Sequence, residues 1–120
     1  MREFLVKLKE ALNEVAPSFL QVPSQTPYPY ITIEPEQSLQ GLPWGPLLLM
    51  ITLKIWSQYT GTKEILKLAK DLENLLQNYI FRPFEGSLKI RESGLVLLKD
   101  GQTRVHTFRL KIRLKGAFYE

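Results

Sequence analysis

Residues 46–56 read PLLLMITLKIW, residues 57–61 read SQYTG, and residues 62–80 read TKEILKLAKDLENLLQNYI. In the first segment, apolar side chains alternate along one face from Leu47 to Ile55, whereas the other face is mixed. This is the pattern of a strand with one fully buried side. The third segment repeats apolar residues at helical spacing, with charged residues between them. We therefore predict a central strand, a tight polar turn, and a helix of about five turns that folds back over the strand.

Before this unit, the sequence predicts a helix, a connector and a short strand. Apolar residues recur at helical spacing over Arg2–Val15, and Pro17 should end that helix because proline lacks the backbone donor needed to continue it. The segment Ser18–Pro29 contains three prolines, which favours an extended connector. Strong β formers alternate over Tyr30–Glu34, and we expect Pro35 to end this first strand.

A long loop, Pro35–Pro46, is predicted to follow the first strand. Connections of this length between neighbouring strands are uncommon and are usually functional or mobile. Its apolar side chains either fold under the loop to close the core or dock on another subunit or protein, since aromatic anchors dominate many interfaces. The candidate interface residues are Leu39, Leu42 and Trp44.

The last third of the chain is predicted to be a β-hairpin. Strands Ser87–Lys99 and Gln102–Lys115 flank Asp100-Gly101, a pair that supplies the two positive φ angles of a type I′ turn. The apolar phase of the first of these strands changes midway, so we expect a β-bulge within residues 92–94. The bulge would give both strands one inward face, formed by Leu88, Ile90, Leu95, Leu97, Phe108, Leu110, Ile112 and Leu114.

The outward face of this hairpin is basic. With the expected bulge, Arg91 should lie opposite Arg109 and Lys89 opposite Lys111, although like charges opposed across a sheet are mildly destabilising. Either this face is simply solvated, which also protects sheets from aggregation, or it contacts DNA phosphates or an acidic neighbouring protein. The candidate basic residues are Lys89, Arg91, Arg109, Lys111, Arg113 and Lys115.

Together these elements predict an α+β fold in the order α-β-β-α-β-β, with an antiparallel or mixed four-stranded sheet and two helices covering one face. A length of 120 residues with 44% hydrophobic content suits one domain, 1–120, that buries about two-thirds of its unfolded surface. There is no cysteine, no signal-peptide pattern and no apolar run of the ~20 residues that a membrane helix needs. We expect a soluble intracellular protein without membrane contact. Its net charge of +4 is compatible with an acidic partner.

The residue inventory gives no catalytic constellation. His106 is the only histidine, and its inward phase in the last strand predicts a partly buried structural residue. The carboxylates are scattered along the chain, so nothing has the spacing of a metal site or of a nucleophile, base and orienting group. We therefore expect no enzymatic activity, cofactor, metal or small-molecule substrate.

Three segments resemble a known family. They are PYITI at 29–33, ITLKIWSQY at 51–59 with Gly61 before the helix Ile65–Leu76, and LKDGQTR at 98–104. In this order they are similar to the tail-completion, or tail-terminator, proteins of long-tailed bacteriophages, prophages and gene transfer agents. The residues between Val15 and Pro27 depart from the family, because a proline-bearing run replaces the glycine-containing turn and short strand found there.

The resemblance implies a structural protein that forms a ring, commonly of six copies, at the head-proximal end of the tail tube. Such a ring would stop tube polymerisation and join the tail to the head connector, so the implied partners are further copies, the tail tube protein and a head–tail connector protein, with passing contact to DNA. The implied location is the virion tail or neck, after assembly in the cytoplasm of a bacterial host. A neighbouring connector subunit fits the same resemblance.

Two other classes remain open from the residues themselves. One is a small non-specific nucleic-acid-binding domain that uses the basic sheet face. The other is a minor subunit of an unrelated enzyme complex, since the fold class is general.

Overall fold

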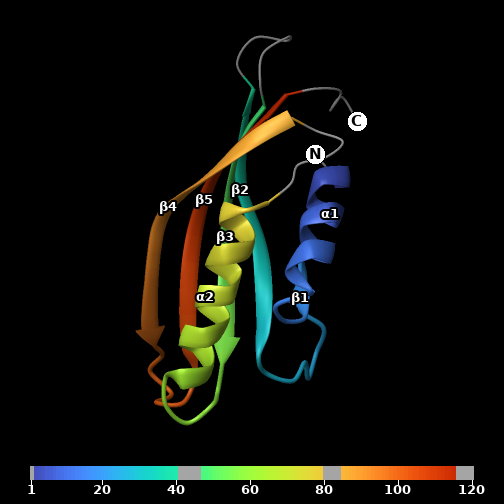
Figure 1. Ribbon diagram of the computed structural model, residues 1–120. Coiled ribbons are helices and arrows are strands. Elements are labelled where there is room, and N and C mark those ends of the chain that lie inside the picture. Colours follow the sequence, from blue (N-terminus) through green and yellow to red (C-terminus); the bar gives the residue numbers. More distant parts are fainter. Residues whose placement is uncertain (1, 41–46, 80–84, 116–120) are drawn as a thin grey trace.

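A single sheet covered by two helices forms the molecule (Figure 1). The computed structural model describes residues 2–40, 47–79 and 85–115. The elements in chain order are α1 (Arg2–Leu12), β1 (Ser18–Phe19), β2 (Tyr30–Gln40), β3 (Leu47–Ser57), α2 (Lys63–Gln77), β4 (Glu85–Leu97) and β5 (Arg104–Lys115). The central strand and the helix after it are confirmed. Both helices end before the predicted Val15 and Ile80.

The sheet has five strands in the order β1-β2-β3-β5-β4. It is mixed, because β1 runs parallel to β2 whereas every other neighbouring pair is antiparallel. The predicted four strands and the order α-β-β-α-β-β are therefore wrong. The additional strand is β1, which lies in the segment Ser18–Pro29 that the sequence predicted to be an extended connector. The backbone N–H of Ile31 donates to the carbonyl of Pro17 over 2.8 Å. A two-residue strand held in this way has no periodicity that a sequence pattern could reveal.

Strand β2 continues through Pro35, where the sequence predicted its end. Residues Gln37–Gln40 pair with Met50–Leu47 of β3, and the register shifts between Pro35 and Gln37. Pro35 is itself registered with Ile51 and the extra residue is Glu36, so the proline lies directly beside a bulge, a place where strands tolerate proline. The predicted loop Pro35–Pro46 is therefore wrong for residues 35–40, and its remaining residues 41–46 lie outside the described part of the chain.

The C-terminal hairpin is confirmed, with its bulge one to three residues before the expected position. The register of β4 against β5 shifts between Ile90 and Glu92, which leaves Arg91 as the extra residue. After this shift, Leu95 and Leu97 have the same inward phase as Ile90, as the apolar pattern predicted. Figure 1 shows β4 bending along its length as it passes α2.

The turn of this hairpin differs from the predicted type I′. Of the Asp100-Gly101 pair only Gly101 has a positive φ, +74°, and its N–H donates to the carbonyl of Leu98. The carboxylate of Asp100 accepts hydrogen bonds from the Thr103 hydroxyl and from the backbone N–H groups of Thr103 and Gln102. These bonds, the Thr103 hydroxyl first, lower the pKa of Asp100. An aspartate that holds the loop through its side chain thus replaces the second positive φ angle.

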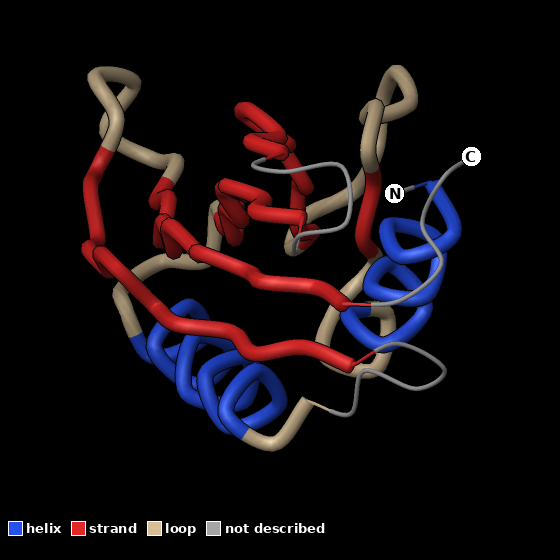
Figure 2. Tube along the Cα trace, turned by 90° about the horizontal axis from the view of Figure 1, so that it is seen from above, coloured by secondary structure: helices blue, strands red, loops and turns tan. Residues whose placement is uncertain are grey.

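Both helices pack on one face of the sheet, as predicted (Figure 2). The buried core contains the apolar stripe of each helix and the inward side chains of β2, β3 and β5. Strand β4 contributes Leu88 and Ile90, which are partly buried against it. Among the described residues, no helix has the length and apolar character that crossing a membrane requires. The core residues are Phe4, Leu8, Leu12, Ala16, Ile31, Ile33, Leu49, Ile51, Leu53, Ile55, Ile65, Ala69, Leu72, Leu76, Phe108, Leu110, Ile112 and Leu114.

Candidate functional site

The helix-free face of the sheet holds most of the predicted functional residues that the structure describes. Side chains alternate along a strand, so the partners of the buried core residues point away from the helices. Registered pairs place Tyr30 beside Trp56 and Thr52 beside Arg109 on this face. One part of the face is aromatic and another is basic, and the two are joined by a short polar region.

The aromatic part is a cluster of four side chains, Phe19, Tyr28, Tyr30 and Trp56, which we call the aromatic cluster. Tyr30 is at its centre. Its ring stacks on Trp56 with centroids 6.1 Å apart, lies 5.1 Å from Tyr28, and meets Phe19 edge-on at 6.3 Å. Burial, followed by the neighbouring Tyr28, raises the pKa of Tyr30. Such contacts contribute about 0.5–1.5 kcal/mol per pair beyond area burial, so the cluster stabilises the pairing between the beginning of β2 and the end of β3.

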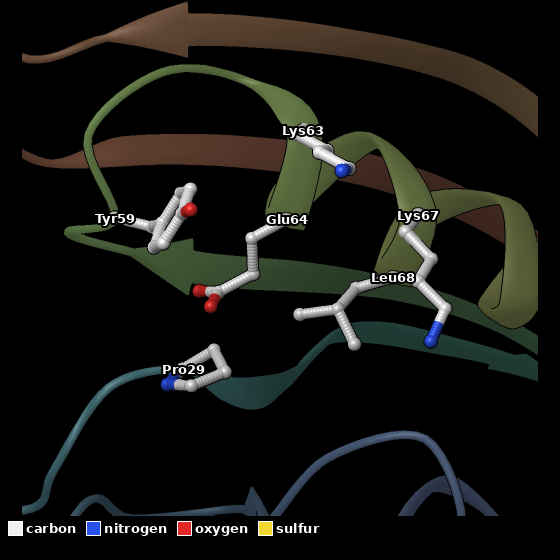
Figure 3. A pocket seen from close by; sticks show the side chains of 6 residues that line it. All are labelled: Pro29, Tyr59, Lys63, Glu64, Lys67 and Leu68. Carbon is white, nitrogen blue, oxygen red and sulfur yellow. The ribbon is translucent and has the colours of Figure 1, made fainter.

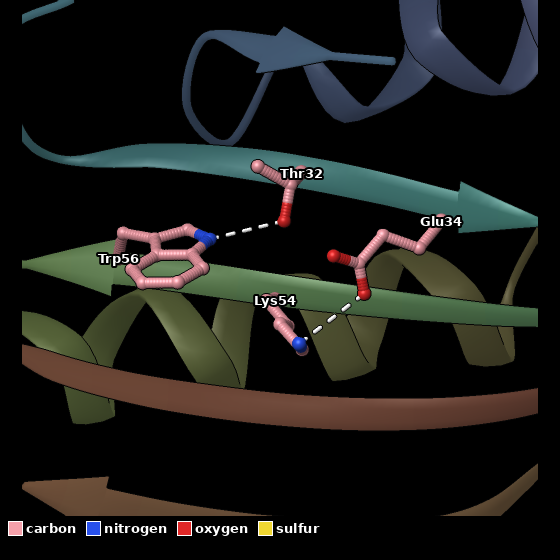
Figure 4. Close-up of polar contacts among 4 residues, drawn as sticks. All are labelled: Thr32, Glu34, Lys54 and Trp56. Atoms are coloured by element: carbon pink, nitrogen blue, oxygen red, sulfur yellow. Dashed lines mark hydrogen bonds and ion pairs between the residues drawn. The ribbon is translucent and has the colours of Figure 1, made fainter. Parts of the chain in front are cut away.

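Polar contacts orient the neighbouring residues on β2 and β3. The indole Nε1–H of Trp56 donates to the Thr32 hydroxyl over 3.0 Å, and the ammonium of Lys54 lies 3.3 Å from the carboxylate of Glu34. Figure 4 shows all four side chains on one side of the sheet, with α2 behind it. The indole covers Thr32, which is buried. The Lys54–Glu34 pair is partly exposed and contributes little to stability.

The basic part differs from the predicted arrangement in one pair. Lys89 lies opposite Lys111 as expected, but Arg109 lies opposite Glu92 and pairs with it at 3.6 Å. Arg91 is not opposite Arg109, because it is itself the bulged residue. The bulge therefore places a carboxylate where the sequence pattern implied a second cation.

Four cations of the basic part form no ion pair with a carboxylate among the described residues: Lys89, Arg91, Lys111 and Arg113. Arg113 lies opposite Ser87, next along the strand from the Lys89–Lys111 pair. The side chains of Lys89, Lys111 and Arg113, which we call the basic patch, lie at regularly paired positions of β4 and β5, whereas Arg91 is the bulged residue. Lys115 belongs to β5 by its backbone, but its side chain lies outside the described residues.

The predicted apolar interface is not tested by the structure. Leu39 pairs with Leu48 through the β2 and β3 backbones, and its side chain is not among those described. Leu42 and Trp44 lie outside the described residues. The interface role of these three residues therefore remains a prediction.

On the other face, His106 is half-buried, as expected of a structural residue. Its Nε2 lies 2.9 Å from the Ser93 hydroxyl, and its ring packs on Phe108 with centroids 4.7 Å apart. Nδ1 is buried without a hydrogen-bond partner among the described residues. Burial lowers the pKa of His106, and the nearby carboxylate of Glu73 on α2 opposes this only in part.

This environment predicts an acid-sensitive fold. Because the pKa of His106 is lower in the folded state than its usual 6.5, the unfolded chain takes up the proton first as the pH falls. The stabilising contribution is therefore present above about 6.5 and is lost as the pH falls through the folded-state pKa. We expect His106→Gln to reduce the pH dependence of the urea midpoint between about pH 8 and pH 5. An unchanged dependence would show that the folded environment does not disfavour the imidazolium.

A pocket of about 370 Å³ opens on the helix-covered side near the beginning of α2. Figure 3 shows side chains of Tyr59, Glu64 and Leu68 facing the space beside Pro29, with Lys67 at its rim. The Glu64 carboxylate accepts a hydrogen bond from the Ser57 hydroxyl over 2.8 Å. Besides this carboxylate, the polar groups of the lining are the Tyr59 hydroxyl and the ammonium groups of Lys63 and Lys67. Among the described residues, no group of three or more His, Cys, Asp or Glu side chains could hold a metal ion.

The aromatic cluster is the feature that sequence reasoning missed. Tyr30 and Trp56 are outward residues of their strands, a signal visible in the alternation. Phe19 and Tyr28 come from the connector, and only the parallel pairing of β1 with β2 brings Phe19 onto the same face.

Comparison with solved structures finds this fold in a virus-like particle. One similar chain comes from a structure described as the virion of a native gene transfer agent (GTA) particle, with a TM-score of 0.69 and 11% sequence identity. The alignment covers 88% of this chain and 84% of that chain. At this identity, the likeness shows a shared fold. No protein-family model matches the sequence, and a search of curated proteins gives no match.

Proposed function

We propose that this protein is a structural subunit of a phage-like tail and that it completes the tail as a ring at the head-proximal end. The observation that carries the proposal is the fold, which is shared over most of both chains with a chain of a gene transfer agent virion. The three sequence segments that resemble tail-completion proteins support the same class. A shared fold does not by itself fix a function, so the specific role belongs to the proposal.

In this role the chain works by contact rather than by chemistry. A closed ring of about six copies, the number implied by the resemblance, needs a head-to-tail contact between two different surfaces of each subunit. The ring would end tube polymerisation, with the tail tube protein on one side and a connector protein on the other. We propose Leu39, Leu42 and Trp44 for subunit or tube contact, and the basic patch for the lumen of the ring or an acidic neighbour.

The test is the absolute mass of the purified protein by light scattering across a concentration series, with electron-microscope images of the main species. We expect ring-shaped particles, and we expect the protein to cap preformed tail tubes and stop their growth. A monomer at every concentration that also leaves tube growth unchanged would contradict the proposal.

A non-specific nucleic-acid-binding domain is the second candidate. The observation that favours it is the placement of an uncompensated basic patch and an aromatic cluster on the same face, since cations and stacking rings are the two components of single-strand binding surfaces. A steep loss of DNA affinity with added salt in a monomeric protein would favour this candidate.

A further inference from the structure

The end of strand β4 exposes apolar side chains at the edge of the sheet. Leu95, Val96, Leu97 and Leu98 follow one another without a charge or proline, and Val96 and Leu97 are 57% and 52% exposed. This strand is the outermost of the sheet on its side. Long, apolar edges of this kind are rare in proteins that remain monomeric, because they attract other chains.

The opposite edge of the same sheet has a second apolar patch. Leu20, directly after β1, is 47% exposed, and Tyr28 of the aromatic cluster is 39% exposed. Phe19 lies beside them and is half-buried. Each edge therefore presents apolar side chains that the monomer leaves open to water.

The sheet register shows that the apolar patch at the β4 edge and the apolar patch at the β1 edge lie at the same position along the strand direction. Successive cross-strand partners form a row across the sheet. One such row begins at Leu95 and ends at Ser18, passing through His106, Ile55 and Ile31. On the helix-free face, the adjacent row joins Val96 through Val105 and Trp56 to Tyr30. An apolar row thus crosses the sheet, with Val96 at one edge and the aromatic cluster at the other.

Strand direction also suits a repeat of identical copies. Strands β4 and β1 run antiparallel to each other within one subunit. A second copy in the same orientation, rotated about an axis along the strands, would bring its β1 edge antiparallel to β4 without a change of level. The two surfaces are different, so the contact is heterologous and can close into a ring.

The β1 edge is closed to backbone pairing at its centre. The N–H of Ser18 donates to the side-chain oxygen of Asn13 over 2.8 Å, which uses a donor that an added strand would need. The contact is therefore made by side chains.

We infer that the subunit contact joins Leu95–Leu98 of one copy to the patch of Phe19, Leu20 and Tyr28 on a second copy of this chain. The inference rests on the ring assembly proposed above and names its two surfaces. In the assembled ring, Val96 covers the aromatic cluster of the next subunit. The rows of all subunits then form a continuous apolar belt on the helix-free face.

Single cysteines can test the contact because the chain contains none of its own. We expect a short bismaleimide to cross-link a mixture of Val96→Cys and Leu20→Cys chains, and neither variant alone, since the contact joins two different edges. Val96→Cys mixed with Leu66→Cys is the matched control, because Leu66 is 50% exposed but lies on α2.

Charged variants provide an independent measurement. Val96→Asp is expected to shift the mass in solution from ring to monomer, whereas Leu66→Asp leaves the ring intact. Cross-linking of Val96→Cys chains with one another would overturn the inference in favour of a two-fold contact. A ring that forms without cross-linking in the first mixture would overturn the named edges while leaving the proposed function intact. Absence of any oligomer, in solution and on tail tubes, would overturn both.

Discussion

Replacing Phe108 with alanine is expected to lower the free energy of unfolding by about 3–5 kcal/mol. Phe108 is 1% exposed and is among the largest fully buried side chains. It lies on β5 between Leu53 of β3 and Ser93 of β4. Truncation removes a ring from the interior and leaves a cavity that these paired strands cannot easily collapse to fill. The urea midpoint at one fixed protein concentration measures the effect, since assembly makes apparent stability depend on concentration.

Leu66→Ala is the matched control for this prediction. Leu66 is also a large apolar residue, but half of its surface is exposed on α2, so its truncation should change stability by less than about 0.5 kcal/mol. A loss of similar size in the two variants would show that the core does not lie between the helices and the inward face of the sheet.

Reversing the charge of two residues in the basic patch, Lys111→Glu with Arg113→Glu, is expected to produce the largest change in binding. If these side chains face DNA in the lumen, each contributes one phosphate contact, so the slope of log affinity for short duplex DNA against log salt should fall by about two. At low salt this corresponds to a loss of at least about tenfold in affinity. Both positions point away from the core, so the fold should be retained.

Lys67→Glu with Lys70→Glu provides the matched control. Both lysines are exposed on α2, and the pair changes the net charge by the same amount on the other side of the sheet. The control should keep most of the salt slope. Equal losses in the two variants would indicate a response to net charge alone, and no loss in the patch variant would remove the lumen role of Lys111 and Arg113.

The C-terminal hairpin shows which structural features the alternation of apolar residues predicts and which it does not. The alternation of Phe108, Leu110, Ile112 and Leu114 was sufficient to predict the buried face of β5, and the change of phase in β4 required a bulge. It did not show which residue is extra. Placing the extra residue at Arg91 instead of one to three residues later puts Glu92 beside Arg109, which changes a predicted repulsive pair into an attractive one.

Proline was the least informative signal. Pro35 was expected to end a strand, yet β2 continues for five further residues to Gln40. A proline removes one donor, and whether that matters depends on whether the partner strand needs it. Here Pro35 lies beside the bulged residue Glu36, a position at which strands tolerate proline. The prolines of the connector before Tyr30 likewise led to a wrong expectation, because this segment contains a strand. That strand is held by a few backbone contacts to β2 and by the Asn13 side chain.

The sequence by itself determined the local elements and their buried faces, because helical and strand periodicity arise within a single segment. It was sufficient for two helices on one face, a central strand and a C-terminal hairpin. Only the tertiary structure decided the features that depend on how segments far apart in the chain pair with one another. This includes the pairing of β1 with β2, the position of the bulge, the aromatic cluster, and the apolar row that reaches both edges of the sheet. A shift of one residue changes every cross-strand neighbour, and no single segment contains that information.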